Sequence, residues 1–254
     1  PNGKCNLYDF GTQVPLAIRW PQQVPGNRVV HDFVCLPDLT PTILQAAGER
    51  VPDVMTGRSL MPVLTSDKAG VVDPLRDAVI VGRERHVAAA RTGNLPYPQR
   101  AIRTKNFLFI RNFQPERWPM GTGPGYGGEG SMPDFATLRE NTFAAFGDLD
   151  ASPTKAWIAL NCEQQDEQRK YFDFAFGLRP EEELYDLRSD FDQIYNVASE
   201  PRYAEAKADL ADRLMSVLRE TGDPRVTGAG LTFEQPPFTA PFRTPGRNPG
   251  RPAH

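Results

Sequence analysis

The sequence is poor in cysteine, and the few cysteines it has lie far apart. Its 254 residues include three, Cys5, Cys35 and Cys162. An odd number at such wide spacing favours neither a disulfide framework nor a zinc knuckle. We therefore expect the fold to depend on packing rather than on cross-links.

Long apolar runs and an excess of one charge are also missing. No run approaches the roughly 20 apolar residues that a membrane-spanning helix needs. The 29 basic and 32 acidic residues give a formal net charge of −3, and the two signs are mixed along the chain. This pattern offers no broad positive face to nucleic acid or anionic lipid, so we expect neither a nucleic-acid partner nor a membrane.

The chain is long enough for one large domain or two small ones. Its hydrophobic share of 39% permits a sizeable core. The sequence opens on Pro1 instead of a starting Met and runs directly into a motif. We expect it to be the back portion of a larger enzyme.

The first part of the chain predicts a strand followed by a helix. Residues 14–20 are densely apolar with a proline near one end, as expected of a short strand covered on both faces in an α/β sheet. Thr40 is a candidate helix N-cap and Gly48 a candidate stop, with Ile43 on the apolar face between them. A short helical turn is expected at 59–64.

From Ala78 onward the pattern predicts an antiparallel sheet and a long helix. Strands are expected at 78–81, 101–104 and 107–113, the last two forming a hairpin, and a short strand at 183–187. Residues 201–220 carry apolar side chains at three- and four-residue steps, which predicts a helix lying on the sheet.

Two segments show no such periodicity. Residues 118–150 are rich in glycine and too long for a simple connector, so they form either a lid or substrate-facing loop or a floppy excursion. The tail 228–254 is rich in proline and predicts disorder.

Five short strings occur in an order typical of one enzyme family. They lie at residues 4–21, 38–44, 56–60, 100–113 and 183–187. The first has a basic residue, a Cys-Asn-Leu-Tyr turn, a glycine, and a Val-Pro-Leu segment that runs on to Trp-Pro. Over roughly its first 226 residues the chain resembles the sulfatase family, most closely the branch of the heparan N-sulfatases and N-sulfoglucosamine sulfohydrolases.

The resemblance implies a fold and a domain division. Residues 1–75 would be the C-terminal part of an alkaline-phosphatase-like α/β sulfatase domain, ending near the Asp73-Pro74 turn. Residues 76–227 would form a smaller α+β domain with an antiparallel sheet and a long helix, and 228–254 a disordered tail.

Cleavage of a sulfate ester or sulfamate places negative charge on the outer oxygens of a crowded sulfuryl centre, and fixed cations stabilise it. The resemblance assigns such a cation to Lys4, as a catalytic and substrate-binding residue. The alternative is a solvated lysine near the start of the chain.

Charged residues at a strand end beside a cleft are well placed to contact a sugar. Glu84 and His86 follow the strand at 78–81, where the resembling branch forms its pocket rim. They are candidate substrate-binding residues, with a solvated sheet edge as the alternative.

The family also implies two cofactors: calcium, held by Asp and Asn side chains, and a formylglycine made from a C-x-P-S/A-x-R string. The string that starts at Cys35 has Asp38 where Ser or Ala is required and lacks the required Arg. We therefore expect neither nucleophile nor metal ligands in this chain, and no activity from it alone.

The sequence thus favours a C-terminal fragment of a sulfatase acting on sulfate esters or N-sulfates of a small sugar or oligosaccharide, such as a glycosaminoglycan. By resemblance, the enzyme would be periplasmic or secreted. Two alternatives remain: a phosphodiesterase or phosphonate hydrolase on the same scaffold, and a non-catalytic glycan-binding module using Trp118 or Trp157. The oligomeric state is left unassigned.

Overall fold

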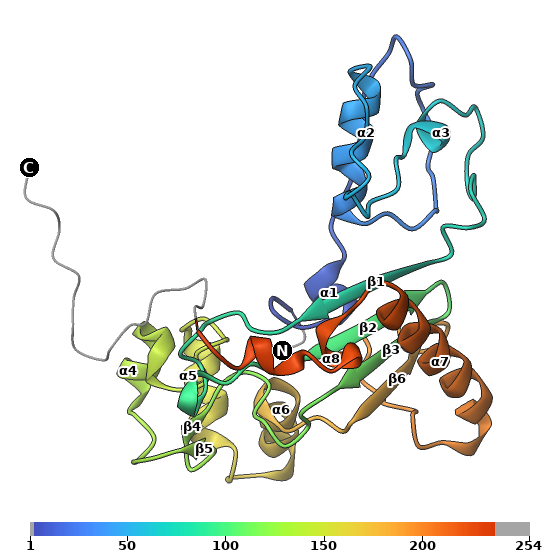
Figure 1. The fold of residues 1–254 in the computed structure, drawn as a ribbon. Helices are drawn as coiled ribbons and strands as arrows, with labels where there is room; N and C mark the ends of the chain where they lie inside the picture. The colour runs from blue at the N-terminus through green and yellow to red at the C-terminus, as the bar shows by residue number, and fades with distance from the viewer. Residues whose placement is uncertain (1–2, 237–254) are drawn as a thin grey trace, which may run out of the picture.

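The computed structural model describes residues 3–236 and shows a body with a projecting arm (Figure 1). The body comprises residues 3–13 and 78–236, and the arm residues 14–77. A four-stranded antiparallel sheet in the order β1-β2-β3-β6 crosses the body. Its strands are β1 (Ala78–Arg83), β2 (Gln99–Thr104), β3 (Phe107–Asn112) and β6 (Glu182–Asp186).

One face of this sheet packs against the long helix α7 (Ala204–Glu220). Leu214 of α7 is fully buried and belongs to one apolar cluster with Phe109 of β3 and Leu184 of β6. Burying this stripe removes apolar surface from water, which is the main force that stabilises such a layer. The predicted hairpin, the short fourth strand and the long helix are confirmed.

The opposite face of the sheet packs against the N-terminal segment. Leu7 and Tyr8 are buried against Leu108 and Ile110 of β3. Successive side chains of a strand point to opposite faces, so Leu108 lies under the N-terminal segment and Phe109 under α7. This packing fixes the position of the residues around Lys4.

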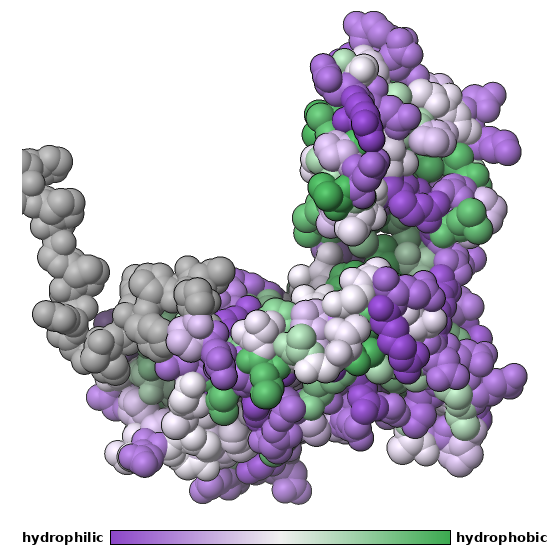
Figure 2. Space-filling view, in the orientation of Figure 1, coloured by the Kyte–Doolittle hydropathy of each residue, from purple (hydrophilic) through white to green (hydrophobic). Residues whose placement is uncertain are grey.

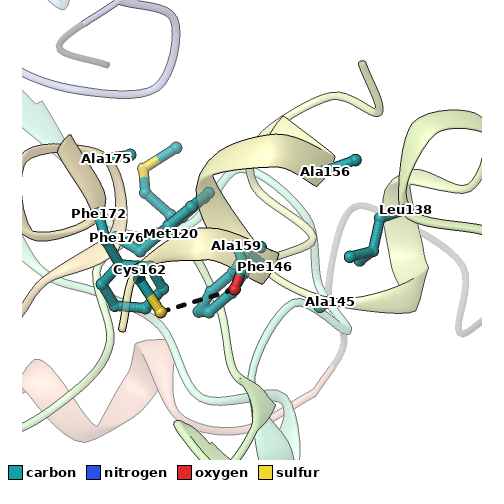
Figure 3. Packing of buried hydrophobic residues seen from close by; sticks show 10 residues of the cluster. All are labelled: Met120, Leu138, Ala145, Phe146, Ala156, Ala159, Cys162, Phe172, Ala175 and Phe176. Atoms are coloured by element: carbon teal, nitrogen blue, oxygen red, sulfur yellow. Dashed lines mark hydrogen bonds between the residues drawn. The ribbon is translucent and has the colours of Figure 1, made fainter. Parts of the chain in front are cut away.

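The glycine-rich segment is part of a second core. It forms the small strands β4 (Gly123–Pro124) and β5 (Gly127–Gly128), and it packs with α4 (Phe135–Glu140), α5 (Pro153–Asn161) and α6 (Asp166–Phe176). Phe146 stacks on Phe176 with ring centroids 4.2 Å apart, and Figure 3 shows both rings among the buried residues of this cluster. The segment is therefore not a floppy excursion.

The arm carries α2 (Leu39–Ala46) and α3 (Met61–Leu64) (Figure 1). Its centre is a buried ion pair in which Arg76 Nη1 lies 2.8 Å from Asp38 Oδ2. Asp38 Oδ1 also accepts a hydrogen bond from the backbone N–H of Arg58 at 2.7 Å. These contacts tie the start of α2 to the end of the arm.

The strand expected at 14–20 is wrong. Within the described residues, this segment is extended but joins no sheet. Val14, Leu16 and Ile18 are 58%, 46% and 40% exposed. No described neighbour covers either face, and a strand needs a partner for its backbone groups.

The arm helix also differs from its prediction. It begins at Leu39, so Thr40 is not its N-cap. The Thr42 hydroxyl instead donates to the carbonyl of Asp38 and accepts from the N–H of Leu60. Ile43, expected on a buried face, is 66% exposed, because nothing described packs on that side. Figure 2 shows such hydrophobic residues, in green, on the surface of the arm.

The end of the described chain returns to the body. Helix α8 (Pro224–Thr227) is followed by a 3-10 turn at Gly230–Phe233. Glu234 then pairs with Arg117 and Arg225, with N–O distances of 3.1 and 2.8 Å. Disorder was expected from Gly228 onward; residues 228–236 make these contacts, and 237–254 lie outside the described residues.

Candidate functional site

The segment around Lys4 is a tight turn fixed from below. The N–H of Asn6 donates to the carbonyl of Gly3 at 3.1 Å, and the hydroxyl of Tyr8 donates to buried Glu183 at 2.7 Å. A Cβ at Gly11 would lie 2.4 Å from the carbonyl oxygen of Asn6, so only glycine allows this approach. The turn therefore presents Lys4 outward from a rigid base.

The ammonium of Lys4 pairs with a carboxylate from the second core. Its Nζ lies 2.9 Å from Asp150 Oδ2, and the two side chains are 61% and 70% exposed. The hydrogen bond that Lys4 donates to Asp150 raises the pKa of Lys4. Lys4 and, more weakly, His86 both lower the pKa of Asp150. The structure thus pairs Lys4 directly with this carboxylate, whereas His86 influences it only weakly through its charge.

A buried carboxylate, Asp148, joins the three segments that meet here. Arg91 Nη2 lies 2.6 Å from Asp148 Oδ2, and the N–H of Val87 donates to Oδ1 at 2.9 Å. The thiol of Cys5 donates to the carbonyl of Asp148 at 3.4 Å. We call residues 3–6, 83–91 and 146–150 the Lys4 corner.

Arg83 supports this corner from inside. It ends β1, is buried, and donates to the carbonyls of Cys5 and Pro119. Its guanidinium and that of Arg91 lie 5.3 and 5.5 Å from the ring centre of Tyr97, within cation–π distance. Burial lowers the pKa of Arg83 to about 10, although Asp148 opposes the shift.

The two predicted rim residues have different surroundings. The carboxylate of Glu84 is held by two arginines, with Arg100 Nη2 and Arg225 Nη2 each 2.7 Å from one of its oxygens. His86 is exposed. Glu84 therefore already binds two cations, whereas the imidazole of His86 is open to solvent.

The cysteines do not provide a nucleophile. Burial, followed by the charge of Asp148, raises the pKa of the Cys5 thiol to about 11, despite the neighbouring Lys4. Burial also raises the pKa of Cys35, whose N–H donates to Asp38 in a turn at the base of the arm. A reactive cysteine needs its thiolate form, so neither Cys5 nor Cys35 is placed to act as a thiolate nucleophile.

The donor set for calcium is not found in this part of the chain. Across residues 3–236, no group of three or more His, Cys, Asp and Glu side chains could hold a metal ion. The described residues therefore do not fit the calcium site of the family. Across the same residues, no helix is long and apolar enough to cross a bilayer.

Sequence reasoning missed Asp148 and Asp150, the acids that organise the corner. Both lie in the glycine-rich segment, where a Gly-Asp-Leu-Asp string at 147–150 is a turn signal. It also offered Trp118 as an exposed sugar platform, but that ring packs edge-on against Tyr126 with centroids 5.4 Å apart.

A family model described as "N-sulphoglucosamine sulphohydrolase, C-terminal" matches residues 3–120, which include the Lys4 turn, the arm and the hairpin. This stretch is therefore similar to the C-terminal portion of sulfatases.

Curated relatives agree with that assignment. An ulvan-active sulfatase of Formosa agariphila is 25% identical over 87% of this chain and 36% of its own length. The human N-sulphoglucosamine sulphohydrolase is 28% identical over 89% of this chain and 40% of its own length. The chain thus spans less than half of the length of either relative.

Among solved structures, one described as a complex with its substrate D-glucosamine-2-N,6-O-disulfate resembles this chain with a TM-score of 0.42 and 19% identity. The match covers 74% of this chain and 25% of that one.

Proposed function

We propose that this chain is the C-terminal part of a sulfatase that hydrolyses sulfate esters or N-sulfates of a sulfated sugar. The observation that carries the proposal is the motif at 4–21, which falls within the family match and presents Lys4 on a rigid turn. The matched relatives act on sulfated sugars by their names, ulvan in one case and N-sulphoglucosamine in the other.

Lys4 would contact the sulfate. A lysine ammonium has three N–H donors, and its described side-chain partner is Asp150. Two donors therefore remain for sulfate oxygens, on which charge grows as the S–O or S–N bond breaks. Exposed His86 would contact the sugar, and Glu84 would hold the rim in place through Arg100 and Arg225.

The rest of the catalytic centre would come from outside this chain, because residues 3–236 hold neither a fitting nucleophile nor a calcium donor set. The arm supports this view. Val14, Leu16 and Ile18 alternate along an extended and exposed segment, as in a strand that pairs with another sheet. We assign residues 1–75 to the catalytic α/β domain on this ground.

The proposal is tested in the complete sulfatase that contains this region. Lys4→Ala should lower kcat/KM for glucosamine N-sulfate or an O-sulfated sugar by about 10²- to 10³-fold, and Lys4→Arg should recover part of the loss. Lys105→Ala, an exposed lysine in the β2–β3 turn, is the matched control. Equal rates for the Lys4→Ala and Lys105→Ala enzymes would remove Lys4 from the site.

The chain by itself should show no turnover of an aryl sulfate or a sulfated glucosamine, with or without calcium. Sulfate release above the buffer rate from this chain would contradict the proposed division of the centre.

A further inference from the structure

A buried lysine lies directly beneath the Lys4 corner. Lys155 is 1% exposed and occupies the first turn of α5, where the Ser152 hydroxyl caps its N–H at 3.1 Å. Lysine is almost never fully buried without partners. The buried side chains of the neighbouring second core are apolar, so apolar packing alone does not explain a charged residue at this position.

The ammonium of Lys155 is enclosed by backbone carbonyls. Its Nζ donates to the carbonyl oxygens of Thr142, Phe146 and Leu149 at 3.0, 3.1 and 2.7 Å. These three bonds use all three N–H groups of a protonated lysine. These bonds hold the backbone of residues 142–149 in a turn around the ammonium of Lys155.

This gathered turn needs support. Phe146 has φ of +48°, a conformation that costs a residue with a side chain on the order of 1–3 kcal/mol. The turn then delivers Asp148 to Arg91 and Asp150 to Lys4. The side chain that holds the turn therefore also sets where both acids of the corner lie.

We propose that Lys155 is a positioning residue for the sulfate-binding corner, whose protonated amine holds the 142–150 turn so that Asp150 can orient Lys4. This inference rests on the proposed role of Lys4 but adds a residue that does not contact substrate. It predicts that the orientation of Lys4 depends on whether Lys155 is protonated, although the two side chains are linked only through the 142–150 turn.

The charge of Lys155 is poised to change near neutral pH. Burial lowers its pKa to about 8, against the opposing field of Asp150. The charges of Lys4, His86 and Lys155 in turn lower the pKa of Asp150. A neutral amine has two N–H groups and a lone pair, so at least one of the three carbonyls loses its donor above this pH.

Deprotonation should loosen the turn without unfolding the protein. The folded-state pKa of about 8 lies below the ordinary value of 10.5. Between these values the unfolded chain binds more protons, so this group makes global stability rise with pH. A local change at Lys4 in this range would therefore not reflect general unfolding.

The test uses the 254-residue chain with 13C-labelled lysine, and follows the Cε signals of Lys4 and Lys155 by NMR between pH 6 and 11. We expect the Lys4 signal to show a step with the same midpoint as Lys155, near pH 8, in addition to its own titration. A single step for Lys4 at its own higher pH, with Lys155 titrating near 8, would overturn the inference.

The same titration of two variants provides a second test. Lys155→Arg keeps the charge near pH 8, because the ordinary pKa of arginine lies far above that of lysine, and should remove the step near pH 8 from the Lys4 signal. Lys170→Arg, at an exposed position of α6, should leave it unchanged. A step that persists in folded Lys155→Arg would also overturn the inference, and the wild-type titration decides if that variant does not fold.

Sulfate binding by Lys4, which is part of the proposed function, is tested separately in the same samples. Addition of glucosamine N-sulfate should shift the Lys4 signal at pH 7 and shift it less at pH 9. A Lys4 signal that ignores the ligand but keeps the step near pH 8 would refute sulfate binding and leave the positioning role of Lys155 intact.

Discussion

Lys4 and Asp150 form an ion pair with Nζ and Oδ2 2.9 Å apart, although 146 positions separate them in the sequence. Because both side chains are exposed, the pair contributes little to stability. Its effect is on position and charge: it joins the N-terminal turn to the second core and raises the pKa of Lys4.

Asp150→Asn should therefore lower the pKa of Lys4 toward its ordinary value of 10.5, because the variant removes the negative charge and leaves only a neutral amide as hydrogen-bond partner. A 13C titration of the lysine side chains measures the shift. Asp53→Asn, which removes an exposed acid paired with Arg50, should leave Lys4 unchanged. Identical Lys4 titrations in wild type and Asp150→Asn would show that the pair does not form in solution.

Asp38→Ala should open the arm while leaving the body intact. Removing one partner of a buried ion pair costs about 3–5 kcal/mol, because the remaining charge stays buried, and here Arg76 would be left without Asp38. Limited proteolysis should cut residues 30–76 faster in the variant. Amide exchange in the sheet should match the wild type, and faster exchange there would show that arm and body unfold together.

Gly121→Ala should destabilise the body more than Gly125→Ala. Both glycines have positive φ, +95° and +76°, but a Cβ at Gly121 would lie 2.5 Å from the carbonyl oxygen of Ala90, whereas the space at Gly125 is open. We expect about 1 kcal/mol of strain at the open position and a larger loss at Gly121. Urea unfolding measures the difference, and equal midpoints for the two variants would contradict the packing around Gly121.

Asp186→Asn should flatten the acid side of the stability profile. The hydrogen bond from Arg188, the largest favourable cause, lowers the pKa of Asp186 to about 2 from an ordinary value of 3.8. Its contribution is thus fully present above about pH 4 and is lost as the pH falls through 2. The variant lacks it throughout, so its Tm should change less between pH 4 and pH 2. Exposed Asp192→Asn should follow the wild-type curve.

The sheet of the body could be predicted from the sequence because its pattern is local. Alternation at 107–112 and the apolar steps of α7 identify buried faces without knowledge of the partner. The same reasoning failed at 14–20, where the apolar residues are real but their partner is not among the described residues. A pattern indicates that a face is apolar, not that something covers it.

The candidate site was only half predictable. Lys4 and His86 stand out by motif and by position after a strand, and the structure pairs Lys4 with Asp150. Asp150 and Asp148 come from the glycine-rich segment 118–150, whose glycines hide any periodicity. Their roles depend on contacts across more than 50 positions, such as Arg91 with Asp148, which no local pattern records.

Both crossings between body and arm are held by an arginine of the body. Arg103 of β2 binds Asp9, in the body segment just before the arm, and Arg213 of α7 binds Asp77, the last residue of the arm. Tilting the arm would require the Asp77 pair to break, and since that pair is about half exposed, dissolved salt should weaken it. The radius of gyration of the chain in solution should accordingly grow with ionic strength, as the arm swings about its remaining tether at Asp9.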